Sequence, residues 1–131
     1  MGGFFGVVCR DEAVSDVFFG TDYHSHLGTH RAGIAAYDKE IGLQRVIHNI
    51  ENSPFRTKFE HIASEMCGSS AIGCISDFEP QPLLIRSKFG TYAICFTGVI
   101  NNADALIKDV LSFGDGSGYF DAMTGGGVNS T

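Results

Sequence analysis

Four cysteines are the candidate nucleophiles of this 131-residue sequence, and the chemistry of each thiol depends on its neighbours. No two of them form a Cys-x-x-Cys pair, and each lies among apolar or small residues, which predicts reduced, buried thiols. Cys74 has Ile72 and Ile75 nearby and no cation close in the sequence, so a strand thiol is favoured over a catalytic one. The other three are Cys9, Cys67 and Cys95.

Three histidines, His24, His26 and His30, follow Asp22 within a short segment. The spacing His-x-His-x-x-x-His can bring imidazole nitrogens onto one metal ion. The same segment stands at the exit of a predicted helix, where histidine is common as a capping or solvent-facing group. The favoured interpretation is therefore no metal site, and no cofactor is predicted.

Two other patterns have a chemical and a structural interpretation. Asp77 and Glu79 flank Phe78 and could serve as paired carboxylates in acid–base catalysis, but solvated loop charges are favoured. Residues 114–118 form a Gly-rich stretch that resembles a phosphate loop. This stretch lacks the Lys-Ser/Thr ending and follows a predicted helix rather than a strand, which favours a turn.

Composition excludes several classes of function. Hydrophobic residues make up 44% of the chain and charged residues 18%, which predicts one folded domain or a piece of a larger one. The 9 basic residues are scattered among 15 acidic ones, so no basic face for nucleic acid is predicted. The start lacks a basic signal-peptide region, and the longest apolar run, 92–100, is too short to span a bilayer. We therefore predict a cytoplasmic protein without membrane contact.

Hydrophobic periodicity predicts six strands and three helices in the order β, α, β, β, α, β, β, β, α. The predicted strands are 4–9, 33–38, 43–50, 70–76, 83–86 and 91–97, with a hairpin turn at 87–90. The predicted helices are 12–25, 55–66 and a third capped by Asn101 or Asn102. Strands in runs with helices between them are typical of an α+β fold with antiparallel pairing.

The third predicted helix has an amphipathic pattern. Its expected buried side carries Leu106, Ile107, Val110 and Leu111, and Asp104 falls in its first turn. From residue 113 to the end the chain is rich in glycine, which predicts a loop or tail. The sequence therefore divides into a domain over 1–112 and a Gly-rich segment over 113–131.

Five segments carry a family resemblance through their order and spacing. They are residues 1–6, 26–34, 73–82, 96–102 and 128–131. In order they are similar to the motifs Met-Cys-Gly-Ile-x-Gly, His-Arg-Gly-x-x-x-Ala-Gly-Ile, Gly-His-x-Arg-Tyr ending in Ala-Gln-Pro, His-Asn-Gly-x-x-x-Asn and Thr-Ser-Asp-x-Glu. These motifs belong to the class II glutamine amidotransferase domain of amidophosphoribosyltransferases. The resemblance implies the N-terminal-nucleophile fold, an αββα sandwich of antiparallel sheets, of which this chain would be the first part.

The family's catalytic positions fall here on residues of other types. The nucleophilic cysteine corresponds to Gly2, which has no thiol, although removal of Met1 would leave an α-amine. The arginine that orders the nucleophile end corresponds to Leu27. The asparagine whose side chain helps form the oxyanion hole corresponds to Thr97, while Gly98 keeps a backbone N–H.

The glutamine-binding positions differ in the same way. The arginine that holds the α-carboxylate corresponds to Ser76, and a hydroxyl does not replace a bidentate guanidinium. The aspartate that takes the α-amine corresponds to about Ser130. A family histidine corresponds to Cys74, which makes this thiol an alternative nucleophile.

These departures predict a degenerate domain that does not hydrolyse glutamine and has a structural or regulatory role. The resemblance implies, as partner, a C-terminal phosphoribosyltransferase domain or a second copy of the chain. One alternative is a module that binds an amino acid or another metabolite in an emptied pocket near Gly2, Leu27, Cys74 and Thr97. Another alternative is an active amidohydrolase that uses Cys74 or the bare α-amine.

Overall fold

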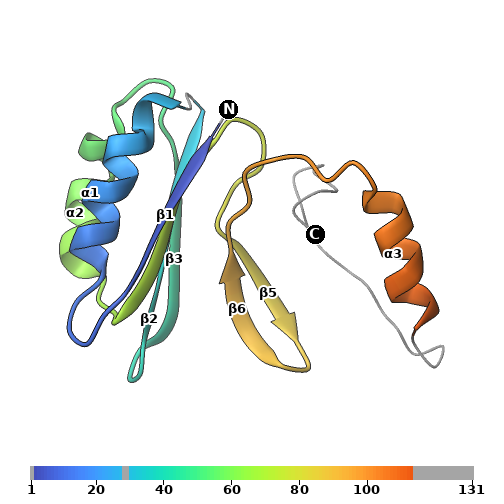
Figure 1. Ribbon diagram of the computed structural model, residues 1–131. Helices are drawn as coiled ribbons and strands as arrows, with labels where there is room; N and C mark the ends of the chain where they lie inside the picture. The colour runs from blue at the N-terminus through green and yellow to red at the C-terminus, as the bar shows by residue number, and fades with distance from the viewer. Residues whose placement is uncertain (1, 28–29, 114–131) are drawn as a thin grey trace.

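The computed structural model describes residues 2–27 and 30–113. It has an α+β fold with antiparallel sheets, as predicted (Figure 1). Every predicted helix and strand is present in the predicted order, and β6 differs most because it ends at Ile94. The elements are β1 (Gly3–Val8), α1 (Val14–His24), a 3-10 helix (Ser25–Leu27), β2 (Arg31–Asp38), β3 (Gly42–Asn49), α2 (Phe55–Glu65), β4 (Ser70–Ser76), β5 (Leu83–Ser87), β6 (Gly90–Ile94) and α3 (Ala103–Ser112).

Four strands form one sheet in the order β1-β4-β2-β3, and all neighbours in it are antiparallel. The register of β4 pairs Ile75 with Gly3 on one side, and Cys74 with Gly33 on the other. β5 and β6 form a separate two-stranded hairpin, and its turn lies where the sequence predicts it. Strands far apart in the sequence are thus brought together at β4.

The two sides of the four-stranded sheet have different coverings. α1 and α2 lie against one side, and the β5–β6 hairpin stands on the other (Figure 1). Side chains alternate along each strand, so Ile34 and Ile75 face the helices and are fully buried. Phe4 and Val8 of β1 point to the hairpin side and are 56% and 86% exposed. The hairpin therefore covers only part of what we call the inner side of the sheet.

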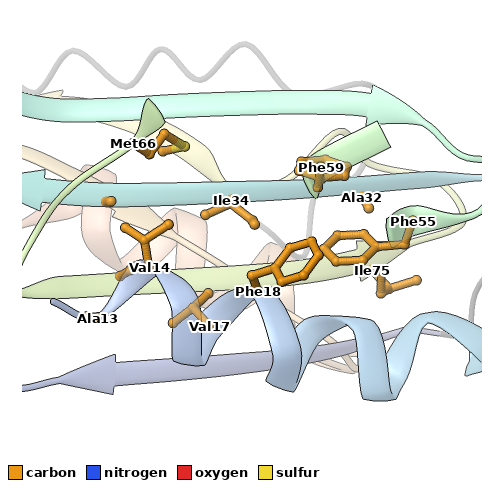
Figure 2. Packing of buried hydrophobic residues seen from close by; sticks show 12 residues of the cluster. Ala13, Val14, Val17, Phe18, Ala32, Ile34, Phe55, Phe59, Met66 and Ile75 are labelled. Carbon is orange, nitrogen blue, oxygen red and sulfur yellow. The ribbon is translucent and has the colours of Figure 1, made fainter. Parts of the chain in front are cut away.

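The hydrophobic core lies between the helices and the sheet, and Figure 2 shows its side chains. Phe55 of α2 stacks on Phe59 of the same helix at 4.5 Å between ring centroids, and on Phe18 of α1 at 5.6 Å. Val14 and Val17 are completely buried on the face of α1 that meets the sheet. Burying one such large apolar side chain stabilises a fold by roughly 1.5–3 kcal/mol, so this aromatic stack holds α2 onto α1.

The predicted buried side of α3 is wrong. No residue of this helix is buried, and Leu106, Val110 and Leu111 are 46%, 63% and 47% exposed. Figure 1 shows α3 standing apart from the sheet and the hairpin. An amphipathic pattern identifies the apolar face of a helix but does not supply the surface that covers it. In the described part of the chain, no element packs closely against this face of α3.

None of the helices described here is long and apolar enough to cross a bilayer.

Close contact between α1 and β4 depends on a glycine. Gly73 faces α1, and a Cβ placed there would collide with the hydroxyl of Thr21 and lie 3.0 Å from the Val17 side chain. Thr21 is 1% exposed, and its hydroxyl has no hydrogen-bond partner among the described residues. The helix is therefore seated directly on the backbone of β4.

We expect Gly73→Ala to destabilise the protein by about 1–3 kcal/mol, because the new methyl group forces α1 away from the sheet. Thr21→Ala should relieve that collision, so the double variant should be more stable than the sum of the single changes predicts. Urea unfolding of the wild type, both single variants and the double variant measures this coupling. Simple additivity of the two changes would contradict the proposed contact.

Candidate functional site

One end of the four-stranded sheet brings together Gly2, Ser76 and Arg31. Pairing of Gly3 with Ile75 places Gly2 next to Ser76, and Arg31 is the direct partner of Ser76 on the other side. Neighbouring strands lie about 4.8 Å apart, so the three positions form a row across β1, β4 and β2. The alternation of side chains turns this row toward the inner side of the sheet, away from the core. The predicted nucleophile and carboxylate-binding positions are therefore neighbours, while their chemical roles remain predictions.

The backbone of Gly2 packs tightly against β4. A Cβ built at this position would lie 2.5 Å from the carbonyl oxygen of Ile75 and 3.7 Å from the Cα of Ser76. Contacts between a Cβ and a backbone oxygen do not form at 2.5 Å, so any larger residue requires the strands to shift. Glycine is therefore the residue that fits at position 2, and this position carries no thiol.

The structure supplies a guanidinium where the sequence predicts only a serine. Arg31 stands directly beside Ser76, and its Nη1 donates a hydrogen bond to the carbonyl oxygen of Phe78 at 2.7 Å. Arginine carries five N–H donors, so this bond leaves others available. The sequence indicated Arg31 only as one of several scattered basic residues, because pairing between β2 and β4 joins residues far apart in the chain.

A histidine and a carboxylate form a polar network at the same end of the sheet. Nδ1 of His30 contacts Oε1 of Glu51, and the amide of Asn49 donates to Oε2 of Glu51 at 3.0 Å. The Asn49 and His30 hydrogen bonds lower the pKa of Glu51, and the positive charge of Arg31 contributes a smaller effect in the same direction. This network was missed because its members come from both sides of the β2–β3 hairpin.

A buried glutamine joins the sheet to the segment that follows β6. Gln81 is 5% exposed, and its Oε1 accepts hydrogen bonds from the backbone N–H of Phe96 at 2.7 Å and from the Cys74 thiol at 3.5 Å. Its backbone crosses β2 so closely that a side chain on Gly33 would collide with the Gln81 carbonyl group. In the sequence Gln81 stands out only as part of the motif at 73–82, although a polar residue between two prolines is itself a usable signal.

The two predicted oxyanion-hole positions follow directly after this anchor. Thr97 and Gly98 come after Phe96, and both are exposed. Gly98 has a φ of +148°, a backbone conformation that residues with side chains rarely adopt. The structure therefore holds the start of this segment through Gln81 but leaves Thr97 and Gly98 open to solvent.

Two predicted positions contribute no described side chain to the site. Leu27 ends the 3-10 helix before β2, and its side chain lies outside the described part of the structure. Ser130 and the Gly-rich stretch 114–118 also lie outside the described residues. The division of the chain into 1–112 and 113–131 likewise remains a prediction.

Cys74 is poorly placed to act as a nucleophile. Its side chain is completely buried, and its thiol faces the Gln81 amide and the thiol of Cys95. The hydrogen bond with Cys74, together with burial, raises the pKa of the Cys95 thiol. The expectation that all four thiols are buried is wrong for three of them, since Cys9, Cys67 and Cys95 are only half-buried, but all four are free.

The other predicted chemical groups do not assemble. Within residues 2–27 and 30–113, no three histidine, cysteine or carboxylate side chains are grouped so as to hold a metal ion. His24 and His26 instead pack edge-on against the ring of Tyr23, while His30 binds Glu51. Glu79, expected as a solvated loop charge, is buried at 5% exposure, so that interpretation is wrong for this residue.

A cleft of about 450 Å³ lies between the four-stranded sheet and the hairpin. It is mostly apolar, and its walls come from β1, β2, β3, β4 and β6, including Val8, Tyr37, Ile72 and Tyr92. Gly2, Cys74 and Thr97 do not line it. The cleft is thus separate from the end of the sheet that carries Gly2, Ser76 and Arg31. It is an open space between the sheet and the hairpin.

Comparison with known proteins gives relatives only among solved structures. No protein-family model and no curated protein matches the sequence. Glutamine phosphoribosylpyrophosphate (PRPP) amidotransferase from B. subtilis, solved with ADP and GMP, matches 94% of this chain with a TM-score of 0.69 and 26% identity. The chain is related to the N-terminal part of this amidotransferase. A second structure, described as the allosteric regulatory enzyme of purine biosynthesis, matches 93% of the chain with a TM-score of 0.68 and 25% identity.

The match to the amidotransferase confirms the α+β fold with antiparallel sheets that the motifs implied. It covers almost all of this chain but only 27% of the B. subtilis amidotransferase, and the same share of the second structure. This chain therefore spans about a quarter of the length of the structures that it matches.

The network around Glu51 should make stability depend on pH. Because the pKa of Glu51 is lower in the folded protein, its contribution is present above the pKa of an ordinary glutamate and is lost as the pH falls through the folded value. We expect Glu51→Gln to be less stable than the wild type at about pH 6, and this difference to shrink below about pH 4. Urea unfolding at both pH values measures it.

Glu60→Gln is the matched control, because Glu60 is an exposed carboxylate in α2. This control should track the wild type at both pH values. An equal loss of stability for Glu51→Gln at low and neutral pH would show that the carboxylate charge is not what stabilises the network.

Proposed function

We propose that this chain is a degenerate glutamine amidotransferase domain of a cytoplasmic, amidophosphoribosyltransferase-like protein. It does not hydrolyse glutamine, and it serves a structural or regulatory role for a phosphoribosyltransferase domain or for a second copy of the chain. The relationship to the amidotransferase supports the kind of domain. The residues at the family's catalytic and binding positions, Gly2, Ser76 and Thr97, support the loss of glutaminase activity.

The packing of Gly2 carries this proposal. Glutamine hydrolysis in the family that this chain resembles begins with a thiol at this position, and the covalent route needs a side chain there. Here the backbone lies so close to Ile75 that a Cβ would be 2.5 Å from its carbonyl oxygen. The pairing of β1 with β4 therefore leaves no room for a nucleophilic side chain at position 2.

Two further positions support the same conclusion. Ser76 replaces the guanidinium that binds the glutamine carboxylate, and Thr97 replaces the oxyanion donor and is exposed. Loss of one oxyanion donor alone slows such a reaction roughly 100- to 1,000-fold. Cys74 offers little compensation, because its buried thiol has an amide oxygen and another thiol as its described neighbours.

The unfilled inner side of the sheet supports a role in assembly. Phe4 and Val8 of β1 are exposed there, and so is Tyr92 of the hairpin, which lines the cleft between the two layers. Apolar side chains gathered on one side of a sheet are stabilised when another layer covers them. A larger protein that contains this chain would supply such a layer.

The purified chain should release no ammonia from L-glutamine above a protein-free blank. Gly2→Cys should remain equally inactive, because a new thiol restores neither the carboxylate anchor nor the oxyanion donor. The same change should destabilise the protein by about 1–3 kcal/mol through the collision with Ile75. A coupled ammonia assay and urea unfolding measure the two effects.

Gly6→Ala is the matched control in the same strand, since a Cβ there meets its nearest neighbour, a methyl group of Ile72, at 3.3 Å. It should cost less stability than Gly2→Cys. Ammonia release by the wild type that depends on glutamine concentration would overturn the proposed inactivity. Loss of that release in Cys74→Ser would then identify the unexpected nucleophile.

Arg31 favours a second candidate function, the binding of a small carboxylate such as an amino acid. Its guanidinium stands beside Ser76 and uses one nitrogen for Phe78. Its remaining donors match the two oxygens of a carboxylate. The Glu51 carboxylate lies close enough to interact with the positive charge of Arg31, and this weakens the attraction of Arg31 for a ligand carboxylate.

This candidate predicts weak binding of L-glutamine, with a Kd of about 1 mM or higher. Arg31→Ala should abolish the binding, and an analogue with its α-carboxylate converted to an amide should not bind. Arg45→Ala is the matched control, because Arg45 also donates to a backbone carbonyl, that of Pro82 at 3.2 Å. Calorimetry that detects no L-glutamine binding, or equal binding by Arg31→Ala, would exclude this function.

A further inference from the structure

Two cysteines from distant parts of the chain meet beneath Gln81. Cys74 lies in β4, and Cys95 directly follows β6. An interaction with Cys74 raises the pKa of the Cys95 thiol. The Gln81 side chain ties the same two segments together, because its Oε1 accepts from the Cys74 thiol and from the N–H of Phe96. The shared Gln81 oxygen therefore holds the Cys74 sulfur near the backbone of Phe96, which directly follows Cys95.

We propose that Cys74 and Cys95 form a reversible disulfide, which makes this pair an oxidation site that fastens the β5–β6 hairpin to the four-stranded sheet. A disulfide needs two cysteines whose side chains point toward each other at short range. Because Gln81 holds the Cys74 sulfur beside the backbone segment that carries Cys95, rotation of the two side chains brings the sulfurs together. Neither residue belongs to the proposed glutamine site, so this inference does not rest on the proposed function.

The oxidant is a small disulfide such as oxidised glutathione. The Cys95 thiolate, which is half-buried, attacks one sulfur of the oxidant and releases the first glutathione as a thiolate. The Cys74 thiolate then attacks the Cys95 sulfur, and the second glutathione leaves. The two protein thiols lose two electrons and two protons in total, and the oxidant becomes two glutathione thiols.

Burial decides the order and the rate of these steps. Cys74 is completely buried, so a bulky oxidant reaches Cys95 first. The Cys74 contact and burial raise the pKa of Cys95, which leaves little thiolate at neutral pH. The first exchange is therefore slow, as suits a thiol pair that responds to sustained oxidation rather than a fast catalytic centre.

The bond would close a loop that contains Gln81, β5 and β6. At present Tyr92, which lines the cleft between the hairpin and the sheet, is 45% exposed, so packing alone holds the hairpin loosely. Cross-links stabilise a fold mainly by restricting the unfolded chain. We expect oxidation to raise the Tm by roughly 5–10 °C.

The test uses the full chain with Cys9→Ser and Cys67→Ser, which leaves only the proposed pair. Removal of Cys67 matters because it shares a tryptic peptide with Cys74. After treatment with oxidised glutathione, the intact mass should fall by two hydrogen atoms, and peptides containing Cys74 and Cys95 should be joined. Dithiothreitol should reverse both changes and the rise in Tm.

Matched variants separate the pair from the other thiols. Cys74→Ser and Cys95→Ser should each abolish the cross-link and the rise in Tm, while Cys9→Ser should keep both. Retention of two alkylatable thiols after oxidation of the double variant would overturn the proposal. Stable attachment of glutathione to Cys95 without closure, or a bond only between separate chains, would overturn it as well.

Discussion

The insertion of β4 between β1 and β2 is the interaction on which the rest of this structure depends. β1 and β2 do not touch as neighbours, and each pairs with β4 along most of its length. Without β4 the sheet would split into an isolated strand and a hairpin, and two-stranded hairpins are only marginally stable in water. The same pairing places Gly2, Ser76 and Arg31 in one row.

The two central strands are also approached closely, β4 by α1 and β2 by the Gln81 segment, and glycine makes both approaches possible. Gly73 in β4 accepts α1, whereas Gly33 in the neighbouring strand accepts the backbone of Gln81. A strand in the centre of a sheet normally presents side chains to the layers above and below it. Here the backbone itself meets those layers, so the helix and the Gln81 segment are seated nearer to the sheet than ordinary side chains would allow.

Local patterns predicted the elements well because periodicity reports which face of a segment is apolar. The strands of the main sheet and the stack of Phe55 and Phe59 follow from such patterns. The predicted burial of α3 failed because periodicity is silent about what covers a face. The row formed by Gly2, Ser76 and Arg31 could not be read from composition or periodicity, since it depends on the register between strands far apart in the chain. The family resemblance supplied two of its three members, and the structure added Arg31.

The open inner side of the sheet has a consequence for how separate molecules of this chain meet. At neutral pH a net charge of −6 makes the molecules repel one another, which opposes contact between their apolar sides. That repulsion disappears near the isoelectric point of about 5.2. Val8 and Phe4 of one molecule can then cover those of another at little electrostatic cost. The side chains that stay exposed on the inner side of the sheet therefore favour association in mildly acidic solution, where net charge no longer opposes it.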